Sequence, residues 1–232
     1  MKKITLGLVA AGVMSLSAVA SAQSAFDGAF GQLGIGYSSA SPSGNSGSQT
    51  ISTAPYVGTY SRSTSFSSTA DFTGTVSVGY YGTVSNNFLL GVGAEYSPLA
   101  GSNTNATTTG GGLTSATSQY KVQNGYNIFL SPALAIDKDK LLYGKVGYAG
   151  TSIQTTYAGS SNPTLNFTGY SLGVGYKQII SGGLYGFAEG NYYSYGNQTF
   201  NSSGTVSGLA YTTTQTVNAN AFNLIAGIGY KF

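Results

Sequence analysis

The sequence predicts an all-β chain that folds as one eight-stranded antiparallel up-and-down transmembrane β-barrel. Three observations predict this fold. Eight segments alternate between apolar and polar or small residues with a period of two, which is the signal of a half-buried strand. Short turns and long polar connections alternate strictly between these segments. Charged residues make up only 6% of the 232 residues, whereas about a quarter is typical of a soluble domain.

The amino terminus, residues 1–22, is expected to be a secretory signal peptide. Lys2 and Lys3 form its basic region, a mostly apolar run follows, and Ala20-Ser21-Ala22 fits the small-x-small rule for cleavage. The apolar run is shorter than the about 20 residues that a membrane-spanning helix needs. Residues 23–232 are then expected to form the barrel domain. Without the two lysines, the net charge is too small for a nucleic-acid partner.

The first four segments are residues 27–37, 73–84, 88–97 and 120–136. In the third, "FLLGVGAEYS", Leu90 and Val92 alternate with Gly91 and Gly93. In the fourth, the alternation places Lys121 on the inward side. The apolar sides are expected to face lipid; they include Leu33, Ile35, Tyr37, Val76, Val78, Tyr80, Phe88, Leu90, Val92, Tyr96, Tyr120, Tyr126, Ile128 and Leu130.

The last four segments are residues 141–151, 168–178, 184–195 and 221–232. The segment "TGYSLGVGYKQ" alternates most regularly, with small residues between its large apolar ones. The segment "LYGFAEGNYYSY" has a thin outward face, and its register is fixed because a shift of one residue would expose Glu189 to lipid. The outward residues are expected to include Leu142, Val146, Tyr148, Tyr170, Leu172, Val174, Tyr176, Leu184, Tyr192, Phe222, Leu224, Ile228, Tyr230 and Phe232.

The connections give an independent signal. Three are tight hairpin turns, "SNN", "DKDK" and "SGG", at residues 85–87, 137–140 and 181–183. The other four are long tracts rich in Ser, Thr, Asn and Gly, expected to be solvated, mobile loops; they lie near residues 38–70, 99–119, 154–166 and 197–215. Short periplasmic turns and long external loops are the layout of an outer-membrane barrel.

The final segment, "AFNLIAGIGYKF", alternates up to Phe232. In a closed barrel this strand pairs with the first one, so that no sticky edge remains. Phe232 and Tyr230 would then lie at the periplasmic interface in an aromatic girdle with Tyr80, Phe88 and Tyr176. The outer girdle is expected to contain Tyr37, Tyr96, Tyr120, Tyr148 and Tyr170.

These features resemble the small OmpA-type outer-membrane β-barrels over nearly the whole mature chain. The run "FTGYSLGVGYKQIISGGLYGFAEGNYYSYG" is similar to a hairpin of that family, with a Gly-rich strand, a short turn and a strand that carries an inward Glu. Tyr230-Lys231-Phe232 resembles the signal that such barrels present to the barrel-assembly machinery. The resemblance implies residence in the bacterial outer membrane and contact with its lipid, and it says little about function.

The charged residues are expected to point inward, because a lysine facing lipid at mid-bilayer costs roughly 2–4 kcal/mol. Counted up from the turns, Lys145, Lys177 and Glu189 lie at nearly the same height on neighbouring strands, below Glu95 and Lys121. We expect one buried cluster in which charges neutralise each other and Glu189 pairs with Lys177 or Lys145. A proton or ion path is the alternative.

The chemistry of known barrel enzymes is missing. Barrel deacylases, acyltransferases, phospholipases and proteases use a histidine, and this chain has none; it also lacks cysteine. No Ser, Asp or Lys spacing indicates a nucleophile with its base. We therefore expect neither an enzyme nor a cofactor or metal site.

Three interpretations of function stay open. The first is an envelope barrel with a structural or surface-interaction role and an interior filled by side chains. The second is a narrow porin for small solutes, favoured by many inward glycines but opposed by the inward rings of Tyr81, Phe129, Tyr143, Tyr185 and Tyr193. The third is a secreted β-rich fibre protein, favoured by composition alone.

Overall fold

The computed structural model describes residues 24–44, 47–99, 101–110, 116–156 and 164–232. The predicted signal peptide, residues 1–22, lies outside them. The described residues form eleven antiparallel strands: β1 Gly28–Gly44, β2 Gly47–Ile51, β3 Gly58–Phe66, β4 Thr69–Ser85, β5 Phe88–Ser97, β6 Thr104–Gly110, β7 Ala116–Asp137, β8 Lys140–Thr156, β9 Thr164–Ser181, β10 Leu184–Val206 and β11 Leu209–Lys231.

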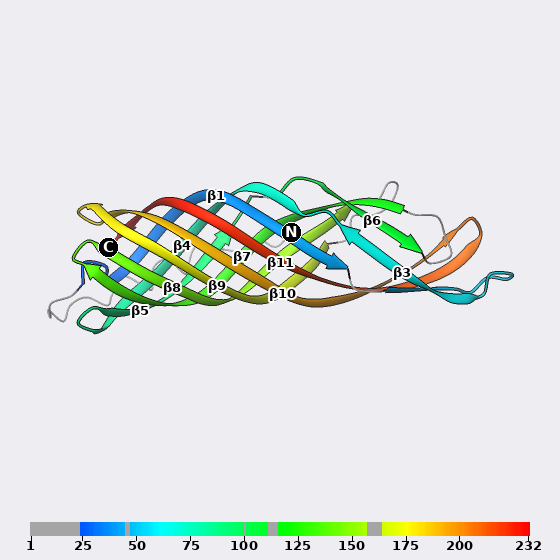
Figure 1. Ribbon diagram of the computed structural model, residues 1–232, viewed down its shortest axis with the longest axis horizontal. Helices are drawn as coiled ribbons and strands as arrows, with labels where there is room; N and C mark the ends of the chain where they lie inside the picture. The colour runs from blue at the N-terminus through cyan, green and yellow to red at the C-terminus, as the bar shows by residue number, and fades with distance from the viewer. Residues whose placement is uncertain (1–23, 45–46, 100, 111–115, 157–163) are drawn as a thin grey trace, which may run out of the picture.

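Eight of these strands close into the predicted barrel (Figure 1). Its order is β1-β4-β5-β7-β8-β9-β10-β11, and β11 returns to pair with β1. Leu33 lies opposite Ile228 at this seam, and the Phe232 amide donates a hydrogen bond to the Ala29 carbonyl at 2.9 Å. The last strand therefore has a partner on both sides, as the sequence predicts.

The three short turns are confirmed. They connect β4 to β5, β7 to β8 and β9 to β10, and they lie with the carboxyl terminus at one end of the barrel, the left end of Figure 1. We call this the turn end and the opposite one the extended end.

The inward and outward faces follow the predicted alternation along most of the ring. On β9, Leu172 and Val174 are 51% and 59% exposed, whereas Ser171 and Lys177 on the opposite face of the strand are buried. A row of apolar side chains this exposed is stable only when lipid covers it. The alternation therefore distinguishes the face of each strand that contacts lipid from the face that packs in the interior.

Of the four long connections, the one near residues 154–166 lies mostly outside the described residues. The other three are not simply loops, so the prediction for them is wrong. They contain β2, β3 and β6, and they lengthen β1, β7, β10 and β11 well beyond the predicted segments. The reason is chemical: their many Thr residues suit strands, and pairing satisfies backbone groups that a loop would leave to water. The extended end in Figure 1 is formed by these strands.

At the extended end, three short strands replace three strands of the ring. The wall there runs β11-β2-β3-β6-β7, in place of β11-β1-β4-β5-β7 nearer the turn end. β11 passes from one partner to the next, since Val217 pairs with Gly44 of β1 and Thr214 pairs with Ser48 of β2. The barrel therefore continues past the length of its predicted strands.

A bulge in β7 overturns the prediction for Lys121. Asn124 has a left-handed backbone with φ of 55°, and the β7–β8 register shifts between Gln123 and Tyr126. Tyr120 is consequently buried at 1% exposure although Tyr126, an even number of residues away, is 40% exposed. Lys121 lies on the outward face, because an extra residue reverses the alternation beyond it.

Candidate functional site

The barrel interior holds a buried ion-pair cluster built from strands that are not neighbours. Lys145 of β8 lies 2.9 Å from Glu95 of β5 and 3.1 Å from Glu189 of β10, measured from Nζ to a carboxylate oxygen of each. All three residues are only 4% exposed. The inward direction of each strand's odd-numbered residues brings them together across the barrel.

Neutral side chains complete the hydrogen bonds of both carboxylates. Tyr143 donates to Glu189 at 2.7 Å, and Asn191 donates to its other oxygen at 2.9 Å. Ser77 donates to Glu95 at 3.1 Å, and Tyr193 donates to it at 3.3 Å. Buried charges are tolerated when they are paired and hydrogen-bonded in this way.

Lys177 belongs to the same interior but not to the ion pairs. It is 2% exposed and lies one layer closer to the turn end, opposite Leu141 and Phe187 of the neighbouring strands. Its ammonium faces four rings at 3.9–5.1 Å from their centroids, those of Phe30, Tyr81, Tyr143 and Tyr185. These ring faces attract the cation.

Of the two partners predicted for Glu189, Lys145 is confirmed and Lys177 is not. The alternation correctly placed Lys145, Lys177 and Glu189 inside the barrel. Counting residues from the turns was too coarse to show that Lys177 lies one layer closer to the turn end than the other two. In these two layers, the ammonium groups of Lys145 and Lys177 balance the carboxylates of Glu95 and Glu189 in formal charge.

Aromatic rings fill the space beside the inward glycines. A methyl group on Gly91 would lie 2.6 Å from the Tyr81 ring, and one on Gly229 would lie 2.3 Å from the Tyr185 ring. Gly175 has the same relation to Tyr143, and Gly93 to Phe129. The small residues thus make room for rings from adjacent strands rather than for a water-filled channel.

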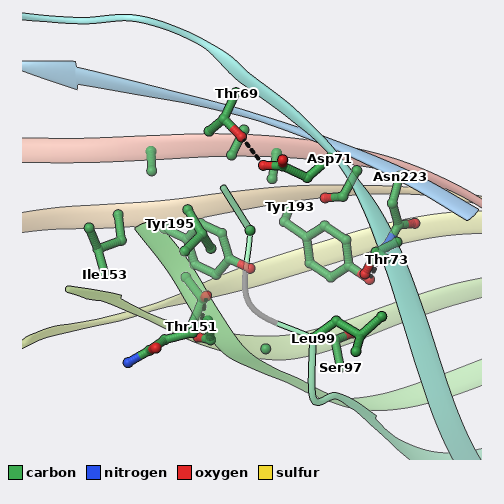
Figure 2. A pocket seen from close by; sticks show the side chains of 18 of the residues that line it. Thr69, Asp71, Thr73, Ser97, Leu99, Thr151, Ile153, Tyr193, Tyr195 and Asn223 are labelled. Atoms are coloured by element: carbon green, nitrogen blue, oxygen red, sulfur yellow. Dashed lines mark hydrogen bonds between the residues drawn. The ribbon is translucent and has the colours of Figure 1, made fainter. Parts of the chain in front are cut away.

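A small cavity of about 90 Å³ lies on the extended-end side of the cluster. Figure 2 shows side chains that line it. Tyr193 and Tyr195, whose rings stack with centroids 6.2 Å apart, line it together with Asn223 and Glu95. Figure 2 also shows the hydrogen bond from Thr69 to Asp71 at its rim. The ion-pair cluster closes this cavity on the side of the turn end, so the cavity does not continue as a channel through the barrel.

The outward apolar row of each ring strand ends toward the extended end in an aromatic residue. These eight residues are 40–59% exposed and form four directly opposed cross-strand pairs: Tyr37 with Phe72, Tyr96 with Tyr126, Tyr148 with Tyr170, and Tyr192 with Phe222. Such a girdle marks a membrane interface. The sequence placed Tyr37, Tyr96, Tyr148 and Tyr170 correctly, wrongly included Tyr120, and missed the other four.

At the turn end, the predicted girdle residues all point outward. Phe88, Tyr230 and Phe232 are 40%, 49% and 71% exposed, and Tyr80 and Tyr176 are half-buried. The stretch from Phe222 on β11 to Phe232, the residue after that strand, matches the about 9–11 residues that a tilted transmembrane strand needs. We infer that the two aromatic levels enclose one membrane thickness.

Comparison with known proteins gives the family. The sequence matches the family model "Outer membrane protein beta-barrel domain" over residues 8–232. The chain belongs to this family. It is a protein of the Gram-negative bacterial outer membrane, and the secreted fibre interpretation is wrong. A comparison of the sequence with curated proteins finds no significant match.

Solved structures of other outer-membrane barrels resemble this family member in fold. OprG from Pseudomonas aeruginosa has a TM-score of 0.57 and 16% identity, over 89% of this chain and 96% of that chain. The protease OmpT from Escherichia coli has a TM-score of 0.45 and 12% identity, over 87% of this chain and 97% of that chain. Ail of Yersinia pestis, solved with the heparin analogue sucrose octasulfate, has a TM-score of 0.41 and 12% identity, over 87% and 99%.

Within the described residues, no group of three or more Asp, Glu, His or Cys residues could hold a metal ion. No helix in that part of the barrel protein is long and apolar enough to cross a membrane.

Proposed function

We propose that this barrel has a structural or surface-interaction role in the envelope and does not conduct solutes. The filled interior is the observation that supports this proposal. Lys145, Glu95 and Glu189 span the interior at one level, and the rings around Lys177 occupy the next level toward the turn end. A solute would have to break buried ion pairs and displace close-packed rings to pass.

The extended end is the part of the molecule suited to surface contacts. It projects past the aromatic girdle as β2, β3 and β6 with the ends of β7, β10 and β11 (Figure 1). Its outward side chains on β3 are exposed and polar, namely Thr59, Ser61, Ser63 and Ser65. We propose that this end faces the cell exterior and that the turn end faces the periplasm.

The proposal includes the chain's route to the membrane. Cleavage after Ala22 would release a mature barrel that starts at Gln23, and the assembly machinery would recognise β11 through Tyr230 and Phe232. Support comes from the exposed aromatic pair itself, since the two ring centroids lie 5.2 Å apart on the outside of the barrel at its closing strand.

We propose that the protein is not an enzyme. Lys145, Glu95 and Glu189 are engaged with one another, aromatic rings surround Lys177, and the chain has no histidine to act as a base near neutral pH. A membrane-surface protease would need a nucleophile or an activated water beside such a base.

The experiment is to refold the protein, verify folding by a heat-modifiable gel shift, and record currents in planar bilayers. We expect a shifted band and no steady channels. Steady unit conductance from shifted protein would overturn the proposal and support the narrow porin. A matched variant, Lys145→Ala with Tyr143→Ala, removes part of the filling and should raise the frequency of current openings if the filling is what blocks the barrel.

A further inference from the structure

A second, larger cavity opens inside the extended end, beyond the aromatic girdle. Its volume is about 330 Å³, within the range of small-molecule sites. Inward residues of β3 and β6 through β11 line it, with Pro42 of β1. None of the six acidic residues of the chain is among them.

The floor of this cavity is apolar and its upper wall is polar. Buried residues from five strands form the floor: Ala106, Tyr120, Ile153, Phe167 and Val217, with Phe66 and Phe200 packed against them. Farther from the membrane, Arg62, Thr64, Thr213 and Gln215 line the wall. A molecule that fits both parts has an apolar body and a polar head.

Arg62 is the only arginine in the sequence, and it lies on the inward row of β3. Its Nη1 donates to Gln49 Oε1 at 3.3 Å and to Thr213 Oγ1 at 3.1 Å. Among the described residues, Arg62 takes part in no ion pair. The guanidinium carries five N–H donors, so Nε and Nη2 keep theirs for a further acceptor.

Gln49, the hydrogen-bond partner of Arg62, lies behind the cavity wall rather than on it, and it also keeps an unused donor. The residue is 1% exposed, its Oε1 accepts from Arg62, and its Nε2 has no hydrogen-bond partner within the described part of the chain. Buried polar groups without a partner are uncommon in proteins. Both residues therefore present unused donors and no negative charge.

Tyr120 on the floor does not supply a negative charge either. Burial and the nearby Asp71 carboxylate raise the pKa of Tyr120 to about 12. Its neutral hydroxyl donates to the Ser67 carbonyl, so the ring presents an apolar surface to the cavity. The positive charge of Arg62 is thus uncompensated in a partly enclosed site.

We propose that this cavity binds a small organic carboxylate, with its carboxylate on Arg62 and its apolar body on the aromatic floor. The planar guanidinium matches a carboxylate through two parallel hydrogen bonds. A single cation suits a monoanion better than a phosphate dianion. The inference goes beyond the proposed function, because it concerns a small molecule and needs no current through the barrel.

The first test measures binding of 3-phenylpropionate by calorimetry to the full barrel in nanodiscs, with empty nanodiscs as the blank. We expect saturable binding to the wild type and a rise in Kd of roughly ten- to hundredfold in Arg62→Gln, the loss of a charged hydrogen bond. Lys121→Gln is the control for loss of a cation, since Lys121 lies on the outward face of β7 and does not line the cavity; its Kd should equal that of the wild type. Acetate, which lacks the apolar body, and 3-phenylpropanamide, which lacks the charge, should bind at least tenfold more weakly.

The proposal is overturned if the wild type shows no saturable binding, if Arg62→Gln binds as tightly as the wild type, or if the amide binds as tightly as the acid. The gel shift verifies that each variant is folded. A barrel that carries no current but fails to bind the probe contradicts this inference alone, whereas a conducting barrel that binds it contradicts only the proposed function.

A second test needs no variant. Phenylglyoxal modifies arginine, and with Arg62 as the only arginine, mass spectrometry of the intact wild-type protein follows one site. We expect 3-phenylpropionate, but not the amide, to slow the modification at least threefold. Equal rates with and without the acid would show that the carboxylate does not contact Arg62.

Discussion

Lys145 and Glu95 lie 2.9 Å apart although their strands, β8 and β5, are separated by β7 in the barrel wall. The ion pair therefore crosses the interior instead of following the sheet. With Glu189 on β10, it ties three separated strands of the ring together. Lys145 therefore stabilises the buried charge of both carboxylates, because each forms its ion pair with this residue.

This geometry predicts a specific pattern of coupling. Glu189→Gln should destabilise the barrel by roughly 3–5 kcal/mol, since it leaves charge on Lys145 less compensated. In a Lys145→Met barrel, the same change should cost much less or stabilise, because it removes an unpaired carboxylate. Urea unfolding in lipid vesicles measures all three variants and gives the coupling energy.

The matched cycle uses Lys177→Met, which removes the other buried ammonium. Because aromatic rings surround Lys177, Glu189→Gln should cost nearly as much in that background as in the wild type. A larger coupling to Lys177 than to Lys145 would contradict the assignment of the pair.

The lipid face gives a depth-dependent prediction on one strand. Leu172→Arg should destabilise the barrel by roughly 2–4 kcal/mol, because Leu172 is 51% exposed inside the apolar band. Thr168→Arg, on the same face of β9 but beyond Tyr170 of the girdle, should cost only about 0–1 kcal/mol. Equal costs in vesicle unfolding would mean that the girdle does not mark the interface.

The packing of rings onto glycines is tested by Gly229→Ala. The added methyl group would lie 2.3 Å from the Tyr185 ring and should cost roughly 1–3 kcal/mol by overpacking. Gly186→Ala on the lipid face of β10 is the control, since its methyl group would meet nothing closer than 3.7 Å and should be nearly neutral. The free energies of unfolding of the two variants test this prediction. A Gly229→Ala variant as stable as the wild type would show that the ring of Tyr185 is not closely packed on Gly229.

The closing strand predicts a cellular phenotype. Phe232→Asp should lower the amount of barrel in the outer membrane severalfold, because it replaces a 71% exposed aromatic of the outward row with a charge. Refolding into vesicles of the purified variant should be affected less, since its backbone bond to Ala29 is unchanged. Wild-type levels in outer-membrane fractions would argue strongly against a role in assembly.

The membrane-embedded part of the fold was predictable because its pattern is local. Each strand alternates between lipid and a filled interior, so Leu172 and Ser171 identify their faces without any knowledge of neighbouring strands. Turn lengths then fixed the strand order. The same rule placed Glu95, Lys145, Lys177 and Glu189 inside, because exposure of a charge to lipid costs more than burial among partners.

The extended end was not predictable in this way. Water covers its outer face, so its Ser and Thr tracts do not need to alternate in hydropathy, and polar strands resemble loops in sequence. Arg62 and Gln49 therefore gave no signal; only the pairing of β2 with β3 and β11 brings them together.

By itself, then, the sequence determined that the chain is an eight-stranded outer-membrane barrel, which face of most strands meets lipid, and that Glu95, Lys145, Lys177 and Glu189 lie inside. Tertiary structure alone decided which charges pair, where the bulge at Asn124 turns Lys121 outward, and how three short strands enclose a second cavity. The physical reason is the separation along the chain of the residues that each effect involves. Transfer between lipid, protein and water acts on each residue separately, whereas ion pairs, bulges and cavities depend on the relative height of strands far apart in the chain.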